Sequence, residues 1–206
     1  MTSDGELLQG WRRGDVAAGR QLFERHYEAL VRFFSGKVAD RDLPDMVQHT
    51  LLACVAHESD IRSADAFRPY LFRIARNVLI SHWRTRSHSI AGLDDGSREL
   101  RAVEPSPSEH LHATRQERLL LSALRRLPVD LQLALELHYW EGLSMAELAD
   151  VLEAPEGTVK STLRRARARL RERIDEISRD PSAVSTTSYR FEHWAGSMRR
   201  QIDRRR

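Results

Sequence analysis

The chain has 206 residues, of which 41% are hydrophobic and 31% are charged, and its formal net charge is +3. A chain of this length forms one ordinary domain or two small ones. It has a single cysteine, which excludes an internal disulfide, and no apolar run approaches the ~20 residues that cross a bilayer. The first residues also lack the basic start and apolar stretch of a signal peptide, so the sequence predicts a cytoplasmic protein.

The first 86 residues predict a bundle of three amphipathic helices. Apolar residues recur at steps of three and four over residues 15–38, again from Asp42 to about residue 58, and again over residues 66–86. The predicted inward positions are Phe23, Tyr27, Leu30 and Phe34 in the first helix, Val47, Leu51 and Val55 in the second, and Phe67, Leu71, Ile74, Val78 and His82 in the third.

Residues 87–113 predict a linker, because glycines and prolines interrupt a stretch without sustained periodicity. Between Ser89 and Ala113 this stretch carries five acidic residues and two basic ones. The linker therefore repels nucleic acid, whereas basic helices flank it on both sides.

Residues 114–177 predict a second helical domain with a helix-turn-helix. One helix ends at Pro128, a second is stopped by Gly142, and a third starts at Ser144, which is spaced from Glu147 as in a capping box. A tight turn leads to a basic helix that begins near Gly157 or Thr158. The fold class is therefore all-α, with two small helical domains joined by a flexible acidic linker.

Residues 178–206 form a C-terminal extension with two open interpretations. Its apolar residues fit one face of a short helix that docks on the protein itself, holds an inhibitory partner, or contacts DNA or a membrane surface, and a frayed terminus is the alternative.

The last helix of the second domain carries six arginines between Arg164 and Arg173. Val159, Leu163, Ala166 and Leu170 mark its inward face, so the basic residues face outward. The first turns of such a helix fit the major groove of DNA, where arginine pairs with guanine. The alternative is a solvated helix end that carries arginines near its C-terminal dipole. The predicted DNA contacts are Lys160, Ser161, Thr162, Arg164 and Arg165.

The third helix of the first domain alternates aromatic residues with arginines. Unpaired bases stack on aromatic rings while arginines follow the phosphates, so the pattern indicates single-stranded DNA. The alternative is that most of these aromatic residues belong to the core. The residues in question are Phe67, Arg68, Tyr70, Phe72, Arg73, Arg76, Trp83, Arg84 and Arg86.

Both halves resemble the extracytoplasmic-function (ECF) group of the sigma-70 family, the bacterial factors that direct RNA polymerase to promoters. In the first half the resemblance rests on DLPDMVQHTLL and AFRPYLFRIARNVLISHWR, and in the second on LPVDLQLALELHYWEGLSMAELADVLEAPEGTVKSTLRRARARLRE. It implies a sigma factor that binds core RNA polymerase and promoter DNA, with an anti-sigma factor as the usual regulator and no small-molecule substrate.

The resemblance also implies roles for individual residues. Asp45, Met46, Val47 and Gln48 match the segment that grips the largest polymerase subunit. Ile61 and Asn77 match the pocket for a base flipped from the minus-ten element, and Arg73 and Arg76 match basic positions nearby. Residues 160–165 match the reader of the minus-thirty-five element.

Four positions depart from the family pattern. His49 replaces a usual glutamate, Leu51 a common phenylalanine, Ile61 a usual aromatic residue, and Glu153 a frequent turn glycine. The first two bear on the polymerase grip, and the third bears on which base is captured.

The sequence gives little support to an enzyme. Residues 14–21 have the glycine spacing of a phosphate loop without its lysine, and residues 57–61 lack the second histidine of a zinc-protease motif. No metal site or cofactor is expected. The open alternatives are a one-component helix-turn-helix regulator that binds duplex DNA without a polymerase grip, and a helical adaptor that binds only proteins.

Overall fold

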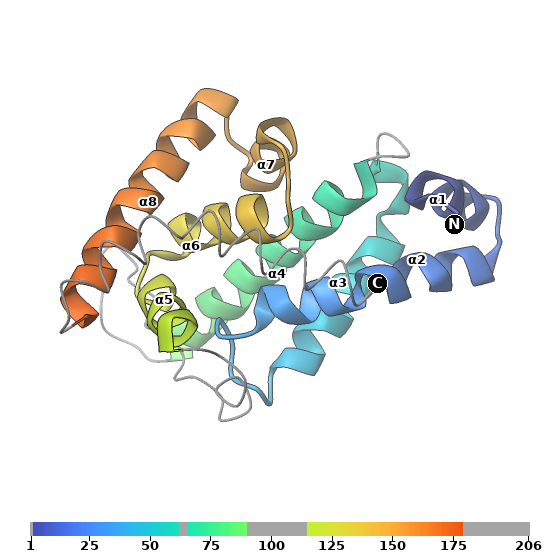
Figure 1. The fold of residues 1–206 in the computed structure, drawn as a ribbon. Helices are drawn as coiled ribbons and strands as arrows, with labels where there is room; N and C mark the ends of the chain where they lie inside the picture. Colours follow the sequence, from blue (N-terminus) through green and yellow to red (C-terminus); the bar gives the residue numbers. More distant parts are fainter. Residues whose placement is uncertain (1, 62–65, 90–114, 179–206) are drawn as a thin grey trace. The chain divides into compact units, whose positions relative to one another are not determined.

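The computed structural model describes residues 2–61, 66–89 and 115–178, and every regular element in these ranges is helical. The chain divides into unit 1, Met1–Asp94, and unit 2, Asp95–Arg206. The boundary between the units falls within the predicted linker. Figure 1 shows unit 1 with α1 (Asp4–Arg12), α2 (Val16–Phe34), α3 (Leu43–Ala56) and α4 (Phe67–Ser89), and unit 2 with α5 (Arg115–Arg125), α6 (Val129–Leu135), α7 (Met145–Leu152) and α8 (Glu156–Ile177).

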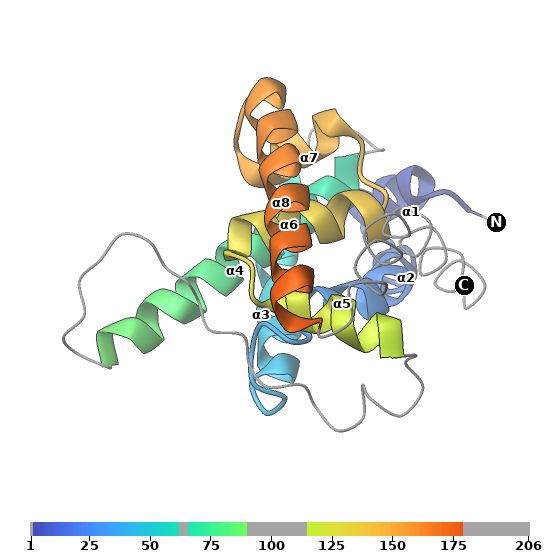
Figure 2. The same ribbon diagram turned by 60° about the vertical axis from the view of Figure 1, so that its left-hand side comes forward.

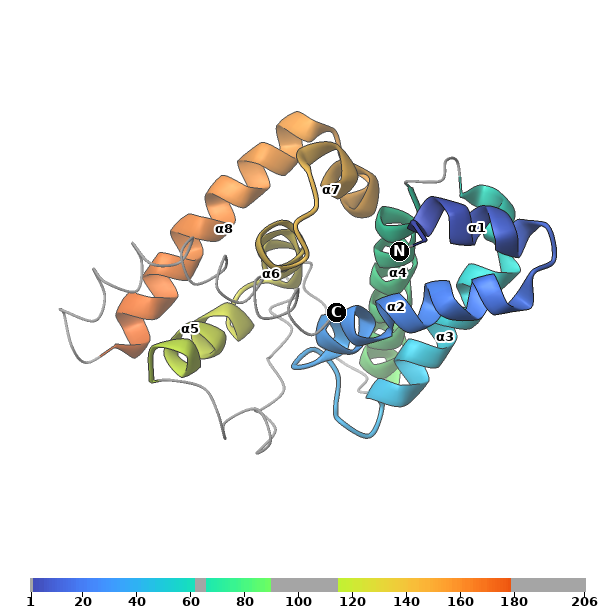
Figure 3. The same cartoon turned by 45° about the vertical axis from the view of Figure 1, so that its right-hand side comes forward.

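The helix α1 was not predicted, although the sequence carries a signal for it. The hydroxyl of Ser3 accepts a hydrogen bond from the backbone of Glu6 at 3.2 Å, and the Glu6 carboxylate accepts one from the backbone of Ser3 at 2.6 Å. This capping box satisfies two amide groups that the start of the helix leaves without partners. A turn at Gly14, where φ is +91°, leads from α1 into α2 (Figure 3).

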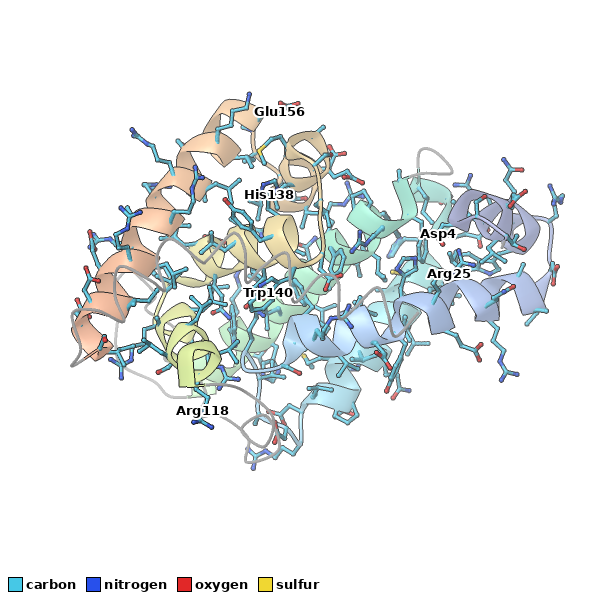
Figure 4. The ribbon with its side chains drawn as sticks, in the orientation of Figure 1. Asp4, Arg25, Arg118, His138, Trp140 and Glu156 are labelled. Atoms are coloured by element: carbon cyan, nitrogen blue, oxygen red, sulfur yellow. The ribbon has the colours of Figure 1, made fainter. Side chains whose placement is uncertain are left out.

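A half-buried carboxylate ties α1 to α2. Asp4 lies 2.5 Å from Arg25 Nη1 and 2.7 Å from Nε2 of His26, and Figure 4 shows Asp4 and Arg25 together. The hydrogen bond with His26, helped by Arg25, lowers the pKa of Asp4 to about 2, although burial opposes this shift. The start of unit 1 is therefore held by an ionised side chain.

The buried face of α2 is rotated from the predicted one. Leu30 and Phe34 are buried as expected, but Tyr27 is 48% exposed and His26 takes the inward position. The apolar residues follow steps of three and four from Leu22, one residue before the predicted start at Phe23. Helical type was thus predictable here, whereas the exact face was not.

In α3 the inward positions are Met46, Val47, Thr50 and Cys54. Val47 was predicted, but Val55 is 49% exposed because Cys54 occupies the inward position. Burial also raises the pKa of the Cys54 thiol to about 12.

In unit 2 the helix-turn-helix follows its sequence signals. The capping box of Ser144 and Glu147 starts α7, as predicted. The helix ends at Glu153, whose φ of +52° is the left-handed conformation that favours glycine. Pro155 then precedes the first residue of α8. Before this motif, α6 continues into a π-helical turn, Glu136–Trp140, which ends near Gly142, where φ is +69°.

The core of unit 2 lies along α8. Its predicted inward residues, Val159, Leu163, Ala166 and Leu170, are all buried. Helices α5, α6 and α7 contact α8, with α7 near its N-terminal half and α5 near its C-terminal end (Figure 2). The outer face of α8 is left for contacts outside the domain.

Two predicted segments fall mainly outside the description. Residues 90–113 of the linker and 179–206 of the C-terminal extension are outside the described residues, while residues 87–89 belong to α4. The domain boundaries therefore stay predictions. Within the described ranges, no helix combines the length and apolar character required to cross a membrane.

Candidate nucleic-acid interface

The outer face of α8 carries four of the five predicted minus-thirty-five residues. Lys160, Ser161, Arg164 and Arg165 are exposed, and they lie within the first three turns of the helix. Within the described part of the chain, Lys160 and Arg164 form no ion pair. Their charges are therefore available to phosphates and base edges.

The fifth residue, Thr162, was predicted to face outward and does not. Its side chain is 8% exposed, because residue 162 follows Val159 by three and precedes Ala166 by four, on the inward face. Its hydroxyl lies 3.5 Å from Nη2 of Arg165, which donates to it. Thr162 therefore orients Arg165 and does not present itself to a partner.

The later arginines of α8 differ from the early ones, because several have partners on the same surface. Arg169 pairs with Glu172 at 2.9 Å, and Arg173 pairs with Glu176 at 2.8 Å. Arg167 lies 3.4 Å from the hydroxyl of Tyr139. The unneutralised charge therefore lies toward the N-terminal half of α8, beyond the acidic first residue Glu156 (Figure 4).

In α4 the aromatic residues belong to the core, which corrects the stacking interpretation. Phe67, Tyr70 and Phe72 are all buried. The Phe67 ring packs against Phe23 with centroids 5.9 Å apart, and the Phe72 ring packs against Phe33 at 5.7 Å. Trp83 is half-buried, and its indole N–H donates to the carbonyl of Lys37 at 3.2 Å. These rings hold unit 1 together and are not a platform for bases.

Three of the four predicted minus-ten residues share one face of α4. Arg73, Arg76 and Asn77 stand at spacings of three and four, with both arginines half-buried and Asn77 exposed. The Arg73 guanidinium lies over the Tyr70 ring, 5.4 Å from its centroid. The face therefore combines cationic groups with one exposed amide, which can hydrogen-bond the edge of a base.

Ile61 does not share that face. It follows a 3₁₀ turn, Glu58–Asp60, in the segment between α3 and α4, and its side chain is 2% exposed. An aliphatic side chain at this depth fills the core. This burial accounts for Ile61 as a core residue and does not test its role in a base pocket, which stays a prediction.

The predicted polymerase-binding segment of α3 splits between two faces. Asp45 and Gln48 are exposed, whereas Met46 and Val47 are buried and hold α3 to the rest of unit 1. This split follows from the helical period, since residues 46, 47, 50 and 54 share the inward face.

The exposed side of α3 continues into two apolar residues that the sequence reasoning missed. Leu52 is 57% exposed and Val55 49% exposed, and with Asp45 and Gln48 they follow steps of three, four and three. We call these four residues the α3 outer face. The same periodicity that was used to find the core would have found this face if it had been counted from Asp45.

Within the described residues, no group of three or more His, Cys, Asp or Glu side chains is placed to hold a metal ion. The arrangement comprises a basic helix face in unit 2, a half-buried basic face on α4, and a mixed polar and apolar face on α3. Such surfaces suit binding to nucleic acid and to protein.

Two family models match the chain, and together they cover more than half of it. The model for Sigma-70 region 2 matches residues 22–89, and the model for Sigma-70, region 4 matches residues 117–170. The predicted DNA-contact residues of α4 and α8 and the α3 outer face lie inside these matches.

Curated relatives and solved structures agree with the two models. The chain is 28% identical to the ECF RNA polymerase sigma-E factors of Haemophilus influenzae, over 85% of this chain and 97% of the relative, and of Escherichia coli K12, over 86% and 97%. The fold is similar to that of CnrH, solved in complex with the cytosolic domain of CnrY (TM-score 0.60, 25% identity, 86% of this chain and 100% of that one). It is also similar to the sigma factor RpoE of Bartonella quintana, solved with the anti-sigma factor NepR (TM-score 0.61, 24% identity, 78% and 98%). The chain therefore belongs to the sigma-70 family as an ECF sigma factor, a protein that directs transcription initiation by RNA polymerase.

Proposed function

We propose that this sigma factor reads promoters with two separate surfaces while a third surface holds core RNA polymerase. The face of α8 at Lys160, Ser161, Arg164 and Arg165 reads the minus-thirty-five element in the major groove. The α4 face at Arg73, Arg76 and Asn77, together with the segment around Ile61, captures an unpaired base of the minus-ten element. The α3 outer face contacts the polymerase in the cytoplasm.

The observation that carries this proposal is the presence of two basic faces of different character on one chain. The early arginines of α8 are exposed on a helix whose opposite side is packed, which is the geometry of duplex readout. On α4, Arg73 and Arg76 are half-buried beside the exposed amide of Asn77. An amide can hydrogen-bond the edge of a base that has left the duplex, so this face suits an unpaired strand.

Energetics explain why unit 1 needs the polymerase. Opening ten base-pair steps costs on the order of 14 kcal/mol, at ~1.4 kcal/mol a step. Each base that stacks on an aromatic side chain returns only ~1–3 kcal/mol, and the rings of Phe67, Tyr70 and Phe72 in α4 are buried. The open strand must therefore be held mainly by the polymerase, while the sigma factor selects one or two bases.

A transcription experiment tests the polymerase contact. L52E places a charge on the α3 outer face, where it is expected to weaken association with core polymerase at least tenfold, because an apolar contact is replaced by a desolvated carboxylate. V16E is the matched control, since Val16 is 80% exposed and belongs to α2, not to the α3 outer face. The measurement is the concentration of each variant that gives half-maximal promoter-specific initiation by added core polymerase.

Two outcomes contradict the proposal. If L52E and V16E behave alike, the α3 outer face is not the polymerase contact. If the unmodified protein does not change the start sites of core polymerase, the chain acts as a duplex-binding regulator without a polymerase grip.

An anti-sigma factor is the proposed regulator. The two solved sigma-factor structures described above each contain a bound partner, which supports this inference. Affinity purification from cells of the source organism is expected to recover one protein in equimolar amount, and addition of that protein is expected to stop initiation. Recovery of core polymerase alone under all conditions contradicts the inference.

A further inference from the structure

The segment that follows α3, residues 57–61, is held by a residue that lies outside both family matches. Nη2 of Arg12, at the end of α1, donates a hydrogen bond to the carbonyl of Ile61 and lies 3.4 Å from the carbonyl of Glu58. Glu58 is the first residue of the 3₁₀ turn Glu58–Asp60, and its carbonyl also accepts a hydrogen bond from the backbone N–H of Ile61 at 3.2 Å. Ile61 directly follows the turn, so Arg12 contacts the backbone at both ends of it. A guanidinium that donates to a carbonyl forms a charge-assisted bond, which is stronger than a neutral one.

Packing of the neighbouring residue fixes the position of Arg12. The Trp11 ring lies directly on Gly19 of α2, where an added Cβ would be 2.7 Å from Trp11 Cδ1. The same ring meets Phe23 edge-on, with centroids 5.1 Å apart. The end of α1 is therefore packed against α2, and this packing fixes the backbone from which the Arg12 side chain extends to residues 57–61.

The segment is also held from α4, on the side of the predicted minus-ten face. The hydroxyl of Tyr70 donates to the carbonyl of His57 at 2.7 Å, and the Arg73 guanidinium lies over the Tyr70 ring. Residues 57–61 and the α4 face therefore share Tyr70 as a common support. Movement of the segment would disturb the position of Arg73.

We propose that Arg12 is a positioning residue for base capture. It fixes the backbone at Glu58 and Ile61, so that residues 57–61 and the α4 face together discriminate among minus-ten bases. This inference rests on the proposed function of that face. The role belongs to a helix that neither family model covers, and it makes α1 part of the promoter-reading apparatus.

The test compares R12M with R13M in holoenzyme reconstituted from the full chain and core polymerase. Methionine keeps an apolar stem and removes the donors. Arg13 is the matched control, because it is exposed on the same helix end and its side chain makes no hydrogen bond or ion pair within the described residues. The templates are a promoter fragment transcribed by the unmodified holoenzyme and copies in which each minus-ten base is replaced in turn.

The readout is the ratio of initiation on the native template to initiation on each substituted one. R12M is expected to lower this ratio roughly tenfold at the captured base, the effect of losing one charge-assisted hydrogen bond, while R13M keeps the unmodified ratio. R12K, which retains a cationic donor, is expected to lie between R12M and the unmodified protein. Because each ratio comes from one preparation, partial unfolding lowers both rates together and leaves the ratio unchanged.

The outcomes separate this inference from the proposed function. If R12M keeps the full ratio, or if R13M loses as much as R12M, the positioning role is overturned while the base-reading function stands. If the unmodified holoenzyme shows no preference at any minus-ten position, the proposed base capture itself is wrong.

Discussion

Helices α4 and α8 both carry many arginines, yet the two helices use them differently. In α4 the Arg68 guanidinium lies over the Phe72 ring at 5.9 Å and that of Arg73 over the Tyr70 ring at 5.4 Å, so the arginines are partly engaged within unit 1. In α8 the inward side is aliphatic, and Arg164 and Arg165 are exposed. The comparison teaches that the number of arginines in a helix does not by itself predict how it would bind DNA. What matters is which guanidinium groups stay exposed after the helix has packed against its own domain.

The largest expected effect tests the α4 side of this comparison. F72A removes a fully buried ring that packs on Phe33, and it is expected to lower the free energy of unfolding of unit 1 by about 3–5 kcal/mol. Chemical denaturation of the full chain, followed by tryptophan fluorescence, measures this change. V16A serves as a control with an expected change within about 0.5 kcal/mol. An unchanged stability, with promoter opening lost, would instead make Phe72 a stacking platform.

The α8 side is tested by removing exposed arginines. R164A and R165A are each expected to weaken binding to minus-thirty-five duplex DNA by about 1–3 kcal/mol and to leave thermal unfolding nearly unchanged. R169A is the control, because Arg169 is already paired with Glu172. Fluorescence anisotropy at several salt concentrations provides the measurement. Equal losses in all three variants would show that α8 contributes only general positive charge.

Acid should affect unit 1 through the carboxylate that ties α1 to α2. The lowered pKa of Asp4 means that its ionised form stabilises the fold above the ordinary carboxyl pKa of about 3.9, and that this contribution is lost as the pH falls through about 2. D4N is therefore expected to be less stable than the unmodified chain by about 1 kcal/mol at pH 5, because solvent screens this half-buried carboxylate, and the difference shrinks toward pH 2. Thermal unfolding across this range measures it. A constant difference would contradict the ionic role of Asp4.

The smallest expected effect concerns the turn that leads into α8. Glu153 adopts a left-handed conformation, which costs a non-glycine residue about 1–2 kcal/mol. E153G is expected to raise the free energy of unfolding of unit 2 by about 1 kcal/mol or less, because glycine also gains freedom in the unfolded chain. A154G, one residue later and without positive φ, is expected to destabilise the same unit. A loss of stability in E153G, measured by thermal unfolding, would contradict this account of the turn.

The helices of unit 2 were largely predictable because their start and stop signals lie at the helix ends themselves. Pro128, Gly142, Ser144 and Pro155 each mark an element end through their own backbone or capping chemistry, and the inward residues of α8 follow a regular period. Only Thr162 was misplaced. Thr162 lies at the edge of the buried face of α8, where a threonine can be either buried or exposed, so its residue type does not predict its exposure.

Unit 1 was less predictable, since which of its side chains are buried depends on contacts between residues that are distant in the sequence. An aromatic residue between arginines suits both a core and a base-stacking surface, and the packing of Phe72 on Phe33 of another helix decides between them. Likewise, nothing near Arg12 in the sequence indicates that it bonds a carbonyl 49 residues later. The capping box of α1 was visible in the sequence and was overlooked.

The burial of Cys54 bears on how this factor receives signals. The thiol lies inside unit 1, and its high pKa leaves almost no thiolate at neutral pH, so peroxide or alkylating agents find little nucleophile to react with. Cys54 is also the only cysteine in the sequence. If transcription by this factor responds to oxidants, the group that reacts with them is therefore expected to belong to the proposed anti-sigma factor and not to the sigma factor itself.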